Sequence, residues 1–243
     1  MTPAPGSGAA PKAWRSRGMH PIYRVYAAVS PYFRRKRMAE LLRFARFAPG
    51  DRVLDVGGLP WFWEGVPLPC RITLLNLKNA PGMERHTGRF DLVEGDATRL
   101  PYPDGAFDVA ISNSVIEHVG SWENQQRFAA EIRRVARRLW VQTPARAFLV
   151  EPHLLAPAIH WLPRAAQRRL IRRFSLWGLF TRPDRARVDA FLDEVRLLNY
   201  AEMRELFPDC EIRRERVLGW TKSYVAVRGA DGPPSPAGRT PAP

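Results

Sequence analysis

The sequence predicts an α/β fold built on a mostly parallel sheet. From residue 38 onwards, segments with apolar residues at helical spacing alternate with short runs rich in β-branched residues, which is typical of such a sheet. The chain has 243 residues, of which 45% are apolar, so it can bury one sizeable core. We therefore expect one domain at 19–230. The tails at 1–18 and 231–243 are expected to be disordered because they are rich in Pro, Gly and Ala and offer little apolar surface to bury.

Each expected element follows from a local pattern. The expected helices carry their apolar residues on one face and lie at 38–47, 124–138 and 201–207. The expected strands are short runs rich in β-branched residues and lie at 52–56, 72–77, 91–94, 107–111, 139–143, 211–218 and 223–227. The last two strands flank Gly219, which predicts an antiparallel pair.

The formal net charge of +14 raises the question of a nucleic acid or an anionic membrane as partner. Nearly all the basic residues are arginine, and a GC-rich coding sequence would produce that composition without a polyanionic partner, which we rank first. The chain contains two cysteines, Cys70 and Cys210, so no disulfide framework is expected. The sequence contains neither a membrane-spanning stretch nor a signal-peptide core, so a cytoplasmic protein is expected.

The residues that follow each expected strand deserve most weight, because a parallel sheet binds its ligand at the carboxyl ends of its strands. The first strand ends in Asp55-Val56-Gly57-Gly58, where the missing Cβ atoms allow a ligand to approach the backbone. A second motif runs from Gly95-Asp96-Ala97 through the turn 100–105 into Phe107-Asp108. A third motif, at 112–119, reads Ser-Asn-Ser-Val-Ile-Glu-His-Val.

Taken in this order and at this spacing, the three motifs resemble those of class I S-adenosylmethionine-dependent methyltransferases. The resemblance covers about residues 52–143 and is strongest to the type 11 group, which is related to the ubiquinone and menaquinone biosynthesis enzymes. It implies a Rossmann-like, seven-stranded, mostly parallel sheet with helices on both faces. It also implies an antiparallel C-terminal strand pair, a helical insertion after strand five and S-adenosylmethionine as the cofactor.

The resemblance further implies which residues hold the cofactor. Its methionine end would lie near Asp55, Gly57 and Gly58, and its adenine near Asp96 and Ala97. Asp96 could instead simply cap a turn. The remaining positions are the ends of strands two and four, occupied by Asn76 and Asn113. Asn76 stands where the family usually has a carboxylate for the ribose hydroxyls, and the turn after Gly58 continues with the bulky run 59–63.

Methyl transfer requires alignment of the acceptor, methyl carbon and sulfur but no covalent nucleophile. For an oxygen acceptor, His118 beside Glu117 is the best-placed base, since its ordinary pKa is near neutrality. The pair could instead cap the next segment or pack against the sheet. Some quinone O-methyltransferases bind a divalent metal with a Glu three residues before this pair. That position is Ser114, so no metal site is expected.

The insertion at 144–199 should form a lid that selects the substrate. Its basic amphipathic stretch at 164–177 favours a lid helix over an anionic membrane contact. Substrate contacts are expected from residues of the insertion and of the N-terminal segment, namely His153, His160, Trp161, Tyr23 and Tyr26.

We expect methylation of a small-molecule or lipid-like acceptor, with O-methylation slightly favoured. Two alternatives stay open. An RNA methyltransferase would need its basic residues to form one face that leads to the cofactor pocket. A non-catalytic Rossmann-like binding protein is favoured if Trp61 or Trp63 fills the cofactor space.

Overall fold

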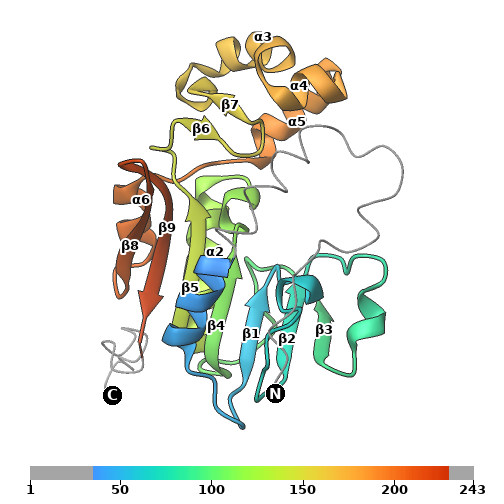
Figure 1. Ribbon diagram of the computed structural model, residues 1–243, viewed down its shortest axis with the longest axis vertical. Helices are drawn as coiled ribbons and strands as arrows, with labels where there is room; N and C mark the ends of the chain where they lie inside the picture. Colours follow the sequence, from blue (N-terminus) through green and yellow to red (C-terminus); the bar gives the residue numbers. More distant parts are fainter. Residues whose placement is uncertain (1–34, 230–243) are drawn as a thin grey trace, which may run out of the picture.

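The structure is a computed structural model that describes residues 35–229. Its centre is a seven-stranded sheet in the order β3-β2-β1-β4-β5-β9-β8 (Figure 1). The strands are β1 (Val53–Val56), β2 (Ile72–Asn76), β3 (Phe90–Glu94), β4 (Phe107–Asn113), β5 (Ala136–Pro144), β8 (Glu211–Val217) and β9 (Trp220–Arg228). Neighbouring strands from β3 to β5 pair in parallel, and β9 pairs antiparallel with both β5 and β8. The predicted α/β class, sheet and C-terminal strand pair are confirmed.

Helices cover both faces of the sheet because alternate strand residues point to opposite sides. On one side, Leu54 and Val56 of β1 pack with α2 (Trp122–Val135) and α6 (Tyr200–Leu206). On the other side, Val53 packs with the helical residues 35–45 and with Trp63. Each face therefore has its own apolar core, and both cores share the strands that lead to the site.

The chain reverses its direction of travel across the sheet between β1 and β4. The strands β1, β2 and β3 lie in one direction from this point, whereas β4 and β5 lie in the other. In open α/β sheets, the loops on either side of such a switch point separate and leave a crevice at the carboxyl ends of the strands. The turn after β1 and the segment after β4 are therefore the places where a ligand would enter.

The predicted helix over 124–138 differs at both ends from α2, which spans Trp122–Val135. Ser121 caps its start by accepting a hydrogen bond from the backbone N–H of Asn124 at 3.2 Å. The residues 136–138 belong to β5 instead. Arg138 is held in the strand because its guanidinium donates to Asp51 Oδ2 at 2.8 Å and to the carbonyl of Ala45. These tertiary contacts override the helical pattern of the sequence.

Residues 145–199 form the lid, which lies above the carboxyl ends of the strands (Figure 1). The lid contains a two-stranded sheet, β6 (Val150–Glu151) and β7 (Ala156–Pro157), followed by α3 (Arg164–Phe174), α4 (Leu176–Thr181) and α5 (Arg185–Glu194). It has its own apolar core around Leu154, Ile171 and Val188. Its two ends meet where the backbone N–H of Arg146 donates to the carbonyl of Leu198 at 2.9 Å.

The amphipathic stretch at 164–177, read from the sequence as one helix, forms two helices that meet at Ser175. The hydroxyl of Ser175 accepts from the N–H of Gly178 at 2.8 Å and donates to the carbonyl of Ile171 at 2.6 Å. Ser175 thereby closes α3 and caps α4, a local exchange of hydrogen bonds that apolar spacing does not report. The apolar side of α3 packs inside the lid through Ile171.

No helix within residues 35–229 is long and apolar enough to cross a membrane. The expected tails at 1–18 and 231–243, together with Tyr23 and Tyr26, lie outside the described residues.

Candidate functional site

The turn after β1 is built around a buried carboxylate. Asp55 is 2% exposed, and its Oδ2 accepts a hydrogen bond from Nε1 of Trp63 at 2.8 Å. Burial raises the pKa of Asp55 to about 7, although the hydrogen bond from Trp63 acts in the opposite direction. The carboxylate is therefore easily protonated here and would be stabilised in its charged form by a nearby cation.

Both glycines of this turn are required by close contacts. Gly57 has a φ of +74°, and a Cβ added to it would lie 2.4 Å from Cγ2 of Val115. A Cβ on Gly58 would lie 2.2 Å from Oδ2 of Asp55. The backbone of the turn is thus packed directly against the first strand and the end of β4, where any larger residue would displace its neighbours.

The bulky residues 59–63 that follow Gly58 pack into the core on the side of the sheet that contains Val53, which we call the second core. Pro60–Phe62 form a short 3-10 helix, Trp63 is fully buried, and Trp61 packs against the same cluster. Trp63 contacts Phe47 and Phe62 edge to face. This arrangement explains why the departure from the family's glycine loop is tolerated, and it counts against a protein in which these tryptophans occupy a ligand site.

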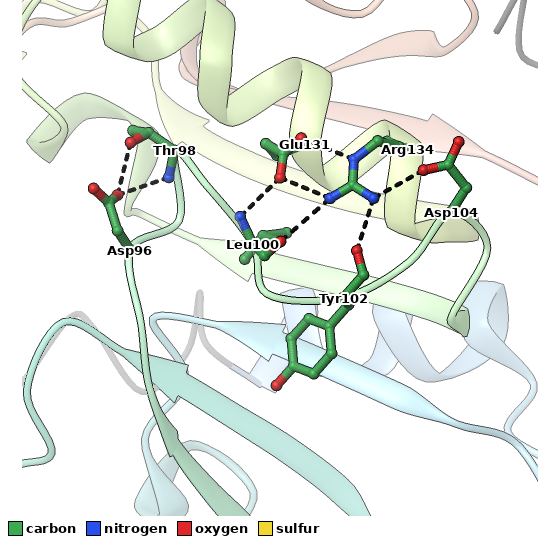
Figure 2. A network of polar contacts seen from close by, with 7 residues as sticks. All are labelled: Asp96, Thr98, Leu100, Tyr102, Asp104, Glu131 and Arg134. Atoms are coloured by element: carbon green, nitrogen blue, oxygen red, sulfur yellow. Dashed lines mark hydrogen bonds and ion pairs between the residues drawn. The ribbon is translucent and has the colours of Figure 1, made fainter.

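Asp96, after β3, caps its own turn. Its Oδ1 accepts from both the backbone N–H and the hydroxyl of Thr98, each at 2.8 Å (Figure 2). The side chain of Asp96 is exposed, and Ala97 is half-buried beside it. The turn-capping role left open by the sequence is therefore present, and the second carboxylate oxygen remains for a ligand.

Helix α2 holds the segment that follows Asp96 in place. Arg134 donates to the carbonyl of Tyr102 at 2.7 Å and to Oδ1 of Asp104 at 2.9 Å (Figure 2). Glu131 pairs with Arg134 and accepts from the N–H of Leu100 at 2.7 Å. The hydrogen bonds from Arg134 keep the pKa of Glu131 below its usual value. The Leu-Pro-Tyr-Pro-Asp motif is thus a rigid loop fastened to a helix.

Two asparagines stand at the ends of β2 and β4. Nδ2 of Asn76 donates to the carbonyl of Gly58 at 3.0 Å and so ties β2 to the glycine turn. Asn113 differs, because both its amide nitrogen and its amide oxygen are buried without a hydrogen-bond partner among the described residues. A buried amide left without partners is costly, so Asn113 indicates a place where a polar ligand completes the site.

On the acceptor side, Glu117, His118 and His153 form a compact group, which we call the histidine cluster. One ligand-type atom from each lies within 4.8 Å of the other two, and the two imidazole rings meet edge to face at 4.8 Å. Glu117 is fully buried and accepts from the hydroxyl of Thr143 at 2.9 Å. Burial raises the pKa of Glu117, whereas His118 and His153 favour its charged form. The sequence had separated these residues into catalytic and substrate positions.

Two glutamates that the sequence analysis missed support the histidines. Nδ1 of His153 lies 2.7 Å from Oε1 of the buried Glu151, and Nδ1 of His118 lies 3.3 Å from Oε1 of Glu194. Burial by itself would lower the pKa of His153, but the hydrogen bond to Glu151 and the charges of Glu151, Glu117 and Glu194 together outweigh it and raise this pKa. The segment Glu151-Pro152-His153 is the one signal in the sequence that could have revealed the first pair.

The other two lid residues named from the sequence take up structural contacts. Nε1 of Trp161 donates to the carbonyl of Arg146 at 2.7 Å, and its ring stacks on Trp220 of the sheet. His160 also contacts the carbonyl of Arg146, at 3.0 Å, and burial lowers its pKa. Its Nδ1 is buried without a partner among the described residues, at a cavity of about 200 Å³ beside Arg196. His160 thus remains a candidate for substrate contact, whereas Trp161 anchors the lid.

Taken together, the fold and the strand-end site define a class of protein. A Rossmann-like sheet of this order, with a glycine turn after β1 and polar residues after β2, β3 and β4, is that of a class I methyltransferase. Residues 72–138 match the model of the "Methyltransferase domain" family. This match and the fold together support a class I S-adenosylmethionine-dependent methyltransferase.

Similar sequences support this assignment over part of the chain. Ajmaline N-methyltransferase of Rauvolfia serpentina is 43% identical over 60 residues, which cover 25% of this chain and 19% of that protein. An uncharacterized methyltransferase of Mycobacterium sp. (strain KMS) is 36% identical over 95 residues, or 37% of this chain and 36% of the relative. The chain thus matches only 19% and 36% of the length of these two relatives.

Solved structures extend the likeness of fold to nearly the whole chain. Burkholderia thailandensis 1,6-didemethyltoxoflavin-N1-methyltransferase has a TM-score of 0.51 at 16% identity, over 93% of this chain and 94% of that one. Phosphoethanolamine N-methyltransferase 2 of Haemonchus contortus has a TM-score of 0.53 at 13% identity, over 80% of this chain and 52% of that one. At these identities the likeness concerns the fold.

Proposed function

We propose that the protein transfers a methyl group from S-adenosylmethionine to a small-molecule or lipid-like acceptor. The observation that carries the proposal is the incomplete polar site at the switch point of the sheet. There the unpartnered amide of Asn113 and the buried carboxylate of Asp55 lie at the ends of neighbouring strands. The glycine turn beside them has no room for side chains. These residues fit a cofactor that has a cationic amino-acid end and a polar nucleoside.

Different residues would bind different parts of the cofactor. Asp55 would stabilise the ammonium of the methionine part, while the turn at Gly57 and Gly58 brings backbone close to it. Asn76 keeps its amide oxygen for a ribose hydroxyl, since its nitrogen is engaged by Gly58. At the adenine, Asp96 would accept from the amino group and the N–H of Ala97 would donate to the ring.

The chemistry supplied by the bound cofactor is a methyl group already activated by its positive sulfur. The work of this chain is to bind, to align the acceptor in line with that methyl group and to exclude water. Alignment of this kind contributes roughly 7–11 kcal/mol to the lowering of a barrier. The lid is placed for the exclusion of water, because it lies above the carboxyl ends of the strands (Figure 1).

At the acceptor end, the histidine cluster favours an oxygen acceptor. A hydroxyl must lose its proton as its oxygen attacks the methyl carbon, and an imidazole such as that of His118 is the side chain that most often takes up such a proton. His118 is partly exposed and lies in edge contact with His153 of the lid. These residues support O-methylation, with His118 and Glu117 as the catalytic pair.

A methyltransferase acting on RNA is less well supported. The arginines are divided between separate surfaces, one on α3–α5 of the lid and another beside β8 and the helical residues 35–45. A nucleic-acid substrate would favour one continuous basic face that leads to the cofactor. The division of the charge counts against that alternative.

Calorimetric titration with S-adenosylhomocysteine tests the proposal. We expect micromolar binding by the wild type, and loss of at least about tenfold in affinity in Asp55→Ala and in Asp96→Ala, since each removes a charged hydrogen-bond partner. Asp91→Ala serves as the matched control, because Asp91 pairs with Arg71 at the opposite ends of the strands. A folded wild type that does not bind S-adenosylhomocysteine would contradict the proposal.

A further inference from the structure

We propose that Glu117, His118 and His153 bind a divalent transition-metal ion. The metal site is inferred from the geometry of these three side chains. Only the role of the ion in catalysis rests on the proposed function. Two of its ligands follow β4, and the third comes from the lid immediately after β6. No metal site was expected from the sequence because Ser114 stands where some quinone O-methyltransferases have a metal-binding Glu; His153 lies far along the chain.

The three side chains lie close enough together to bind one ion. The ligand-type atoms of the three side chains lie within 4.8 Å of one another. Atoms bonded to one ion at about 2.0–2.2 Å lie up to about 4 Å apart. Small rotations of the three side chains would therefore bring all three atoms within bonding distance of one ion. Two imidazoles and one carboxylate leave further positions open for water or a substrate oxygen, as in catalytic rather than structural metal sites.

The orientation of the histidines also fits a metal ion. Each ring directs Nδ1 to a carboxylate, His153 to Glu151 at 2.7 Å and His118 to Glu194 at 3.3 Å. A carboxylate on Nδ1 fixes the tautomer that leaves Nε2 as the electron-pair donor, and metal-binding histidines commonly have such a partner. Glu151 is itself fixed, because its second oxygen accepts from the backbone N–H of Leu154.

One carboxylate oxygen of Glu117 has no hydrogen-bond partner among the described residues. Glu117 is fully buried, and its Oε1 makes no hydrogen bond with any of residues 35–229. Its Oε2 is occupied by the hydroxyl of Thr143. A buried carboxylate oxygen without a donor is costly, and a cation between the two histidines would remove that cost. This observation is independent of the spacing of the histidines.

The donor set selects the kind of ion. Imidazole nitrogens suit Zn²⁺, Fe²⁺ and similar ions, whereas Mg²⁺ and Ca²⁺ prefer a shell of oxygens. Zinc is therefore the first probe. If the protein methylates a hydroxyl, that oxygen could bind the ion, which would ease release of its proton to solvent. The oxygen would then form its bond to the methyl carbon as the carbon–sulfur bond breaks, and His118 would be a metal ligand instead of the base.

Equilibrium dialysis of the full-length, chelator-treated protein against Zn²⁺, with metal analysis, tests the site. We expect one equivalent of zinc per chain with micromolar or tighter affinity, and much weaker binding of Mg²⁺. His153→Ala should lower the zinc affinity at least about 100-fold. Glu151→Gln should lower it about 10–100-fold, the usual effect of removing a histidine's carboxylate partner. His86→Ala should have no effect, because His86 is an exposed histidine outside the cluster.

Cobalt substitution separates this site from adventitious binding. Co²⁺ bound by nitrogen and oxygen should give visible ligand-field bands that His153→Ala abolishes. Absence of zinc binding, zinc binding unchanged in folded His153→Ala, or a thiolate band from Cys70 or Cys210 would overturn the proposal. S-adenosylhomocysteine binding, measured in the same His153→Ala protein, should persist. A wild-type protein that binds zinc but does not bind S-adenosylhomocysteine would instead contradict the proposed function and support the metal site.

Discussion

Asp55 shows how a single residue connects stability with binding. Its carboxyl group is enclosed by the second core, and Trp63 supplies a hydrogen bond at 2.8 Å. In a protein selected only for stability, a buried charge without a cation is unfavourable. In a site that receives an ammonium group, the same charge contributes to affinity. We therefore expect Asp55 to lower the stability of the free protein and to strengthen binding of the proposed cofactor.

This trade-off predicts that Asp55→Asn stabilises the protein at alkaline pH. Burial raises the pKa of Asp55 from 3.8 to about 7. Between these values the folded state holds the proton and the unfolded state does not, so wild-type stability falls as the pH rises from about 4 to 7. Asn lacks this titration. We expect the variant to be more stable by roughly 2–4 kcal/mol at pH 8, and by much less near pH 4, in urea unfolding.

The comparison of pH values is its own control, because packing changes would affect both conditions. A variant less stable than the wild type by the same amount at pH 4 and pH 8 would contradict the burial argument for Asp55.

Residues whose role depends only on neighbouring positions could be recognised from the sequence. Residues whose role depends on contacts with distant segments of the chain could not. Gly57 and Asp96 could be recognised because a tight turn and a capped turn are encoded within a few positions. The role of Trp63 and the pairing of His118 with His153 depend on chain segments that fold back from elsewhere. No local pattern reports such contacts, so the histidine cluster could not be assembled from the sequence.

At the scale of elements, Gly178 determines how α3 and α4 pack in the lid. A Cβ at this position would lie 2.0 Å from the carbonyl oxygen of Ile171 and 2.6 Å from the Cα of Arg172, both backbone atoms. We predict that Gly178→Ala separates the two helices and raises amide hydrogen exchange throughout the lid, with little change in the sheet. Gly88→Ala is the matched control, because its Cβ would meet nothing within 4 Å. An unchanged lid in Gly178→Ala would refute this packing.

A buried ion network joins the last strand to α2. Arg228 is 6% exposed; it pairs with Asp209 and donates to the carbonyl of Arg133 at 2.9 Å. Asp209 also pairs with Arg133 at 2.6 Å. Burial opposes the charge of Asp209, but the two arginines outweigh it and keep the pKa below its ordinary value.

We predict that Asp209→Ala destabilises the fold by about 3–5 kcal/mol at pH 7, because it leaves a buried guanidinium without its partner. The folded-state pKa is depressed, so the wild-type contribution is present above the ordinary pKa and is lost as the pH falls below about 4. Denaturant unfolding at pH 7 and pH 3 measures both effects. A destabilisation that is equally large at pH 3 would contradict the assignment to ion pairing.

For the whole molecule, one of the two basic surfaces lies on the lid. Arg168, Arg169, Arg172, Arg173, Arg182 and Arg185 line one open groove of about 890 Å³, which we call the arginine groove. Arg168 pairs with Asp189, whereas the other five form no ion pair with a described residue. Leu179 and Phe174, 52% and 65% exposed, lie in the same helices. Unpaired cations beside exposed apolar groups favour an anionic lipid surface.

We predict salt-sensitive binding to vesicles that contain anionic phospholipid and none to neutral vesicles. The double variant Arg172→Glu and Arg173→Glu should weaken binding by at least about tenfold, since each basic residue near such a surface contributes about 1 kcal/mol. Arg213→Glu is the control on another surface, where Arg213 lies beside Glu211. Vesicle binding unaffected by the double variant, or preference for RNA over vesicles in a competition assay, would exclude the lipid interpretation.

The sheet could be predicted from the sequence far better than the lid. Strands β1, β2, β4 and most of β5 are buried apolar runs, and such runs predict strands whatever surrounds them. The lid is small and has a core of its own, so its helix boundaries depend on single residues such as Ser175 and Gly178. The strand-end residues proposed to bind the cofactor could thus be named from the sequence. The grouping of the residues proposed for the acceptor could not, because it depends on the placement of the lid.

Amide hydrogen exchange with and without S-adenosylhomocysteine tests the central claim, that the carboxyl ends of the strands form a cofactor site. The account predicts slower exchange in three segments, after β1 at 56–62, after β3 at 95–98 and after β4 at 113–116, with little change at the opposite ends of the strands. Absence of protection, or protection confined to the arginine groove of the lid, would contradict it.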